Sequence, residues 1–186
     1  MATASNSAQV ERPRTALVVA VGAAVAVVLG VYGKVHDPAL EPLVTLGFSG
    51  MLQMKAWLAT LAVLLVVVQL VSALWMWGRL PFGPAPAWNT PVHRWSGTVA
   101  FVVSLPVALH CLWSLGLDTS SPRVLVHGVT GCCFYGAYAA KMVGLRVSGL
   151  PSWALPVLGG LVFGLFVLVW LTSALWFFTR SGVPLT

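Results

Sequence analysis

Residues 93–144 read HRWSGTVAFVVSLPVALHCLWSLGLDTSSPRVLVHGVTGCCFYGAYAAKMVG. Two long apolar runs flank a short polar turn, a pattern that predicts two membrane-spanning helices joined by a loop. The stretch also contains three of the four histidines of the chain, His93, His110 and His127. A histidine inside a bilayer is costly to keep without a function, so these residues are the first candidates for a functional site.

The composition of the whole chain is that of a membrane protein. Of its 186 residues, 59% are hydrophobic and only 8% are charged, and the mean hydropathy is +0.92. These values lie far from those of soluble globular domains. The formal net charge is +6, but the ten Lys and Arg residues lie singly at the ends of apolar runs. Nucleic-acid binding needs a clustered basic patch, so the sequence predicts the lipid bilayer, and no nucleic acid, as the surroundings of the chain.

Apolar runs of membrane-crossing length recur on both sides of the opening stretch. They predict an all-α bundle of five transmembrane helices within residues 15–178, with a disordered tail over 1–14 and a short tail over 179–186. The expected spans are about 16–33, 51–77, 93–115, 124–145 and 153–178. In the last span, Gly160 and Gly164 have the Gly-x-x-x-Gly spacing that favours close helix packing.

The basic residues predict the orientation of the chain in the membrane. Five spans place the termini on opposite faces, and cytoplasmic loops carry an excess of Lys and Arg. With the N-terminus inside, the cytoplasmic side holds Arg12, Arg14, Arg79, Arg94, Lys141 and Arg146, and the outer side holds Lys34, Lys55, Arg123 and Arg180. The majority of six against four predicts a cytoplasmic N-terminus.

His110 and His127 are predicted to hold one haem iron between them. With span centres at positions 105 and 135, a rise of about 1.5 Å per residue puts His110 roughly 7 Å and His127 roughly 12 Å from the midplane, in the same half of the bilayer. Consecutive helices joined by a short loop are usually neighbours, so the two imidazoles are expected to face each other. A haem b with two axial histidines has no open coordination position, which favours electron transfer over oxygen chemistry.

Other residues near these histidines fit the same prediction. Span four supplies small residues, Gly131 among them, where a flat macrocycle could approach the backbone. Haem propionates need cations, and Lys55 and Arg123 are expected at about the right level. The alternative is that the buried histidines only form hydrogen bonds to backbone, water or each other. The three cysteines, Cys111, Cys132 and Cys133, are expected to pack in apolar surroundings.

His93 is expected to play a different part from His110. It lies 17 positions earlier, which is about 260° of rotation on a regular helix, so the two do not share a face unless Pro106 bends the helix. Beside Arg94 at the mouth of the span, His93 is a candidate contact for lipid head groups, a quinone or a partner subunit.

The string His93-Arg94-Trp95-Ser96 resembles the start of a haem-ligand helix in the cytochrome b subunits of quinol-oxidising complexes. The His-x-x-x-Gly spacing of His93 to Gly97 and of His127 to Gly131 is similar to that of transmembrane ferric reductases. These resemblances imply b-type haem in a helical bundle. The spacing of His93 and His110 differs from that of the two-haem helix of cytochrome b, so one haem is expected.

Five further strings resemble a family of small uncharacterised bacterial membrane proteins of unknown function: MKAWLAT, HRWSG, LPVALHC, RVLVHG and FYGAYAAKM. This resemblance covers most of the chain and implies the bacterial plasma membrane. Members of that family occur beside Rieske-type iron-sulfur proteins, so the resemblance also implies a redox partner protein within a membrane complex.

The sequence therefore predicts a membrane b-type cytochrome that passes electrons between quinone or a partner redox protein and an acceptor. Such a chain would be a subunit of an oxidoreductase rather than a complete enzyme. A haem-free membrane anchor or assembly subunit is the main alternative. A small transporter is a third, weakened because the spans show neither an inverted repeat nor acidic residues.

Overall fold

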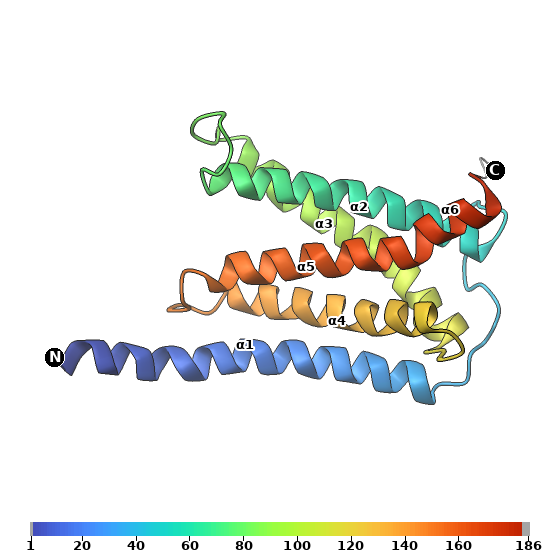
Figure 1. The fold of residues 1–186 in the computed structure, drawn as a ribbon, viewed down its shortest axis with the longest axis horizontal. Coiled ribbons are helices and arrows are strands. Elements are labelled where there is room, and N and C mark those ends of the chain that lie inside the picture. Colours follow the sequence, from blue (N-terminus) through green and yellow to red (C-terminus); the bar gives the residue numbers. More distant parts are fainter. Residues whose placement is uncertain (1, 184–186) are drawn as a thin grey trace. The chain divides into compact units, whose positions relative to one another are not determined.

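The structure is a computed structural model that describes the backbone of residues 2–183 and the side chains of residues 13–183. Over these residues the chain is helical, with no strand. Figure 1 shows the helices, which are α1 (Ala2–Val35), α2 (Met51–Met76), α3 (Asn89–Leu109), α4 (Pro122–Gly144), α5 (Ala154–Trp170) and α6 (Trp176–Ser181). Two π-helical segments, η1 (His110–Leu115) and η2 (Leu171–Leu175), continue α3 and α5.

In the described part of the chain, four helical stretches are long and apolar enough to cross a bilayer: Pro13–Val35, Met51–Met76, Asn89–Leu115 and Ala154–Ser181. The shortest has 23 residues, and at about 1.5 Å per residue it is about 34 Å long, against a hydrocarbon core of about 30 Å. Each begins and ends within a few residues of a predicted span. These helices have the length and composition expected of a multi-pass membrane protein.

The predicted span over 124–145 corresponds to α4, which is not one of these four stretches. Polar and small residues, among them Thr130, Tyr135 and Lys141, interrupt its apolar sequence. The reason is its packing, since α4 contacts both α1 and α5 and buries Thr130 and Gly136. A helix that is covered by protein on two sides needs less apolar surface than one that faces lipid all round.

The turn before α4 explains where that helix begins. The Asp118 carboxylate accepts hydrogen bonds from the Ser120 hydroxyl, at 2.6 Å, and from the Ser120 backbone N–H, at 2.8 Å. These bonds lower the pKa of Asp118. The Ser121 hydroxyl then accepts from the Val124 N–H, and Pro122 occupies the first turn, where a missing N–H costs nothing.

The helices form two compact units. Unit 1 contains the chain up to residue 36 together with residues 117–169, and unit 2 contains residues 37–116 together with the chain from residue 170. The chain therefore passes from one unit to the other three times. α5, η2 and α6 follow one another without a break, and the division falls within α5. Residues up to Val169 belong to unit 1, and residues from Trp170 onward belong to unit 2.

Unit 1 is held together by a close approach of α1 and α4. A Cβ atom added to Gly22 would lie 2.9 Å from the Gly136 carbonyl oxygen and 2.9 Å from the Ala140 Cβ. Only glycine lets the two backbones come this near. On its other side α4 meets α5, where the rings of Phe134 and Phe166 lie 4.8 Å apart.

Unit 2 pairs α2 with α3, which run side by side in Figure 1. The end of the last helix packs against α2, where Ala56, Ala59 and Ala174 form a small buried cluster. The Trp170 indole N–H donates to the Thr60 hydroxyl at 3.0 Å, which gives the ring's polar atom a partner inside the apolar contact.

Helix α1 begins at Ala2, within residues 1–14, and the disordered tail over 1–14 stays a prediction. The glycine contacts differ from the sequence-based expectation. The prediction of close packing at Gly160 and Gly164 is wrong within unit 1, since a Cβ atom on either glycine would meet nothing within 4 Å. The close glycine contact lies between α1 and α4 instead.

Candidate functional site around His110

His110 lies where α3 changes into the wider π-helical turn of η1, and its side chain is 0% exposed. Pro106, one turn earlier, has no backbone N–H to donate, which loosens the helix at this point. The His110 Nδ1 atom lies 2.7 Å from the Pro106 carbonyl oxygen. A carbonyl only accepts, so Nδ1 carries the proton and Nε2 carries the lone pair.

The Nε2 atom of His110 accepts a hydrogen bond from the backbone N–H of Val44 at 3.3 Å. Val44 belongs to the connecting segment 37–50, which forms two more hydrogen bonds to η1. The Ala39 N–H donates to the Trp113 carbonyl at 3.2 Å, and the Leu40 N–H donates to the Ser114 carbonyl at 3.0 Å. The carbonyls at a helix end lack donors within the helix, and the N–H groups of segment 37–50 are the donors here. Leu40 has a positive φ of 58° to make this contact, which is uncommon for a residue other than glycine.

Buried polar groups gather at the same end of unit 2, where α2 begins and η1 ends. Gln53 is 5% exposed and Lys55 is 9% exposed, although both are polar residues in an apolar helix. The Gln53 side-chain oxygen accepts from the Ser49 hydroxyl. Among the described residues, however, the Gln53 amide nitrogen and the Ser114 hydroxyl have no hydrogen-bond partner. A buried polar atom without a partner costs about 1–3 kcal/mol, so this end of the unit has unused capacity to bind a polar group.

The predicted cofactor residues are divided between the two units. Unit 2 holds Lys55, His93 and His110, while unit 1 holds Arg123, His127 and Gly131, all three on α4. His127 and Arg123 are half-buried, and a Cβ atom on Gly131 would meet nothing within 4 Å. Haem ligation by the pair His110 and His127 therefore stays a prediction. No group of three or more His, Cys, Asp or Glu side chains is placed to hold a metal ion in the part of the chain with described side chains.

His93 takes part in a polar network between α2 and α3. Its Nδ1 atom lies 2.8 Å from the Ser72 hydroxyl. The backbone carbonyl of Ser72 accepts a hydrogen bond from the Asn89 side-chain amide at 3.0 Å. The Gln69 amide donates to the His93 carbonyl and, at 2.9 Å, to the Ser96 hydroxyl. The sequence places Gln69 and Ser72 three residues apart on one face of an apolar span, which is the pattern that could have revealed this network.

The network gives Gly97 a role that the sequence does not reveal. A Cβ atom on Gly97 would lie 2.9 Å from the Gln69 side-chain carbonyl, so this glycine makes room for the amide. The glycines of the two His-x-x-x-Gly strings therefore have different surroundings. Gly97 contacts the Gln69 side chain, whereas a Cβ atom on Gly131 would meet nothing within 4 Å.

The contact between Gln69 and Gly97 can be tested with a double-mutant cycle that compares free energies of unfolding. Gly97→Ala is expected to lower the free energy of unfolding by about 1–2 kcal/mol, because the new methyl group displaces an amide held by two hydrogen bonds. In a Gln69→Ala background the same change is expected to be neutral, since nothing remains to be displaced. Thermal unfolding in detergent measures both values. Equal losses in the two backgrounds would contradict the contact.

These features define the class of the protein: over its described residues the chain is helical, has four helices long and apolar enough to cross a membrane, and contains buried polar contacts within unit 2. Residues 15–185 match a family of unknown function, DUF6529, and the chain belongs to that family. The resemblance to an uncharacterised family is thus confirmed. No curated protein and no solved structure matches the chain.

Proposed function

We propose that this protein is a membrane-embedded electron-transfer subunit that binds one b-type haem, with His110 as an axial ligand. The observation that supports the proposal is the fixed tautomer of His110, whose Nδ1–H bonds the Pro106 carbonyl at 2.7 Å. Histidines that bind metals almost always donate their other ring N–H to a carbonyl or carboxylate, which orients the ring and leaves a lone pair for the metal. The π-helical turn at His110 fits this role, because such turns are frequent at functional sites.

The hydrogen bond from Val44 is the contact that ligation would replace. At 3.3 Å it is long for an N–H donor, and a hydrogen bond of this kind contributes about 1 kcal/mol net. Segment 37–50 would release this bond while keeping its contacts to Trp113 and Ser114. When bound, the haem would carry one electron at a time through its iron.

Polar residues at the end of unit 2 where α2 begins and η1 ends would hold the carboxylates of such a group. The Gln53 amide and the Ser114 hydroxyl have no partner among the described residues, and Lys55 supplies the cation that a propionate needs. On the sequence argument alone, His127 is the second axial ligand, Arg123 a second cation and Gly131 a point of close approach. His93 is proposed as a contact for quinone or for the partner redox protein.

The membrane arrangement is part of the same proposal. With α4 as a fifth span, the chain would cross the bacterial plasma membrane five times, with its N-terminus in the cytoplasm. The 23 residues of α4 make a helix of about 34 Å, which is long enough to cross the hydrocarbon core. The excess of basic residues at positions 12, 14, 79, 94, 141 and 146 supports the orientation.

A haem-free membrane anchor or assembly subunit is the second candidate. It is favoured by the fact that both ring nitrogens of His110 have backbone partners within unit 2. A histidine satisfied in this way is stable when buried and needs no cofactor to explain it.

An absorption spectrum of the purified protein tests the proposal. After reduction with dithionite, the protein expressed with added haem precursor is expected to show the sharp α-band of a low-spin b-type haem. A pyridine haemochrome assay is expected to give close to one haem per chain. Membranes from cells without the gene provide the control. A protein that stays colourless under these conditions would favour the anchor function, and two haems per chain would contradict the single site.

A further inference from the structure

We propose that the outer face of α3 near its first residues binds the head group of an anionic phospholipid. Pro91, Arg94, Trp95 and Thr98 line a shallow hollow of about 300 Å³ there, which we call the Arg94 face. Their spacing of three, one and three residues places them on one stripe of the helix. The proposal does not depend on haem binding.

Two hydrogen-bond donors on the Arg94 face have no partner among the residues with described side chains. The Arg94 guanidinium is exposed and forms no ion pair with any of them. The Trp95 side chain is 69% exposed, and its indole N–H has no acceptor there either. Thr98 is different, because its hydroxyl already donates to the Arg94 carbonyl at 3.0 Å. The hollow therefore offers a guanidinium and an indole N–H to an acceptor from outside.

The length of the helix places these donors near the boundary between the hydrocarbon core and the head-group layer. The stretch Asn89–Leu115 has 27 residues, which makes it about 40 Å long, or about 5 Å longer at each end than a centred hydrocarbon core of about 30 Å. Arg94 lies five residues from the start, about 7 Å along the helix axis. A long basic side chain at that depth extends outward to the phosphates.

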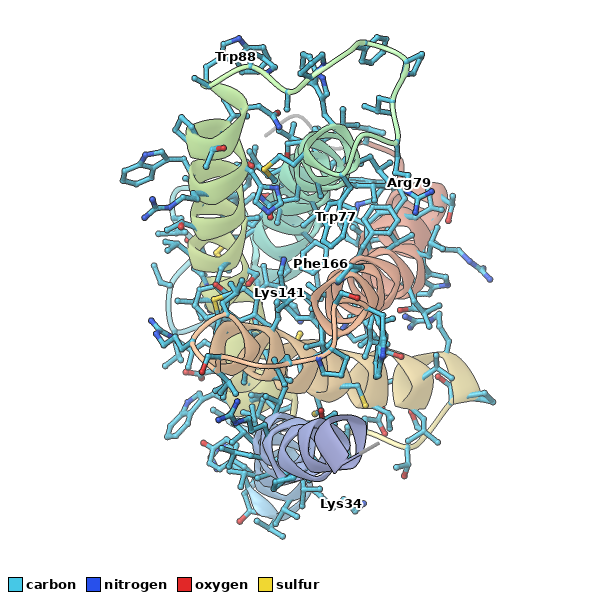
Figure 2. All side chains as sticks on the ribbon, turned by 90° about the vertical axis from the view of Figure 1, so that its left-hand side faces the viewer. Lys34, Trp77, Arg79, Trp88, Lys141 and Phe166 are labelled. Atoms are coloured by element: carbon cyan, nitrogen blue, oxygen red, sulfur yellow. The ribbon has the colours of Figure 1, made fainter. Side chains whose placement is uncertain are left out.

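Aromatic residues at the same end of unit 2 mark it as an interface. Figure 2 looks onto this end and labels Trp77, Arg79 and Trp88. The Trp88 ring meets the Trp75 ring edge-on at 5.4 Å, and both Trp77 and Trp88 are exposed. Tryptophans gather where the hydrocarbon meets the head groups, so a lipid phosphate is the acceptor within reach of Arg94.

Charge favours an anionic lipid over a zwitterionic one. Arg79 and Arg94 are both exposed at this end, while the acidic residues of unit 2, Asp37 and Glu41, lie in segment 37–50 at the other end. A guanidinium binds two phosphate oxygens in a fork geometry. The ammonium group of phosphatidylcholine would bring a second cation close to Arg94, whereas phosphatidylglycerol carries none.

Native mass spectrometry of the full chain with phosphatidylglycerol or phosphatidylcholine tests the proposal. Arg94→Gln is expected to weaken phosphatidylglycerol binding about fivefold, the usual effect of one basic residue at an anionic surface, and to leave phosphatidylcholine binding unchanged. Trp95→Phe keeps the net charge but removes the indole donor, and it is expected to weaken phosphatidylglycerol binding about threefold. Arg180→Gln, which removes an exposed charge from α6, is the matched control and is expected to bind like the wild type.

Three outcomes would overturn the proposal. Unchanged phosphatidylglycerol binding by Arg94→Gln would show that the Arg94 face is not the site. An equal loss in Arg180→Gln would mean that total charge alone attracts the lipid. Competition by millimolar inorganic phosphate as strong as that by the lipid would assign the face to a free anion. Circular dichroism confirms that the variants, all at exposed positions, keep their helix content.

Discussion

Gly136→Ala is expected to lower the free energy of unfolding of the protein by about 1–3 kcal/mol, the usual cost of forcing an extra methyl group into a filled contact. The new Cβ would press against the backbone carbonyl of Gly22 and would lie 2.9 Å from the Ala26 Cβ. Neither neighbour is the end of a flexible chain, so the two helices must move apart. Gly136→Leu is expected to prevent the packing of α1 on α4 altogether.

Gly131→Ala is the matched control for this experiment, because it makes the same change five positions earlier in α4. A Cβ atom at Gly131 meets nothing within 4 Å, and alanine is a better helix former than glycine by about 1 kcal/mol. This variant is therefore expected to be neutral or slightly more stable. Thermal unfolding in detergent compares the two. Equal stability of both variants would show that α1 and α4 do not approach each other through Gly136.

His110→Ala is expected to abolish the low-spin haem spectrum, because loss of an axial ligand opens a coordination position on the iron. His93→Ala serves as the control and is expected to keep the spectrum, since that ring is engaged with Ser72 between α2 and α3. Reduced-minus-oxidised difference spectra of the two variants measure the effect. Loss of the signal in His93→Ala but not in His110→Ala would contradict the role proposed for His110.

His110→Ala also removes the acceptor of the Val44 N–H, so misfolding has to be separated from loss of a ligand. His110→Gln keeps an acceptor at this position but not an imidazole, and it is expected to fold without a low-spin haem. Added imidazole is expected to restore the spectrum of His110→Ala by filling the vacated space. If His110→Gln retains a wild-type spectrum, His110 is not a ligand.

The helices were predictable from the sequence because each depends on residues that are close together in the chain. The start of α2 at Met51 follows directly from the change to an apolar run, and the other spans differ from prediction by a few residues. α4 is less apolar than the other predicted spans, because it is covered by α1 and α5.

The contacts of the histidines were not predictable, because they join residues that are distant in the sequence. His110 accepts from Val44, 66 positions away, and His93 meets Ser72, 21 positions away. The hydropathy pattern gives the depth of a histidine but not the backbone group that it meets. The same limit explains Gly160 and Gly164, since a glycine pair shows that a close approach is possible without showing which helix faces it.

The contact between Gly22 and Gly136 has a consequence for how the protein is made. The two residues are separated by 114 positions, and a ribosome adds about 5–20 residues per second, so α1 waits about 6–23 s before its partner is synthesised. During that time α2 and α3, which pair within unit 2, are synthesised first. Until α4 is made, the Gly22 side of α1 therefore lacks the partner that it has in the folded protein.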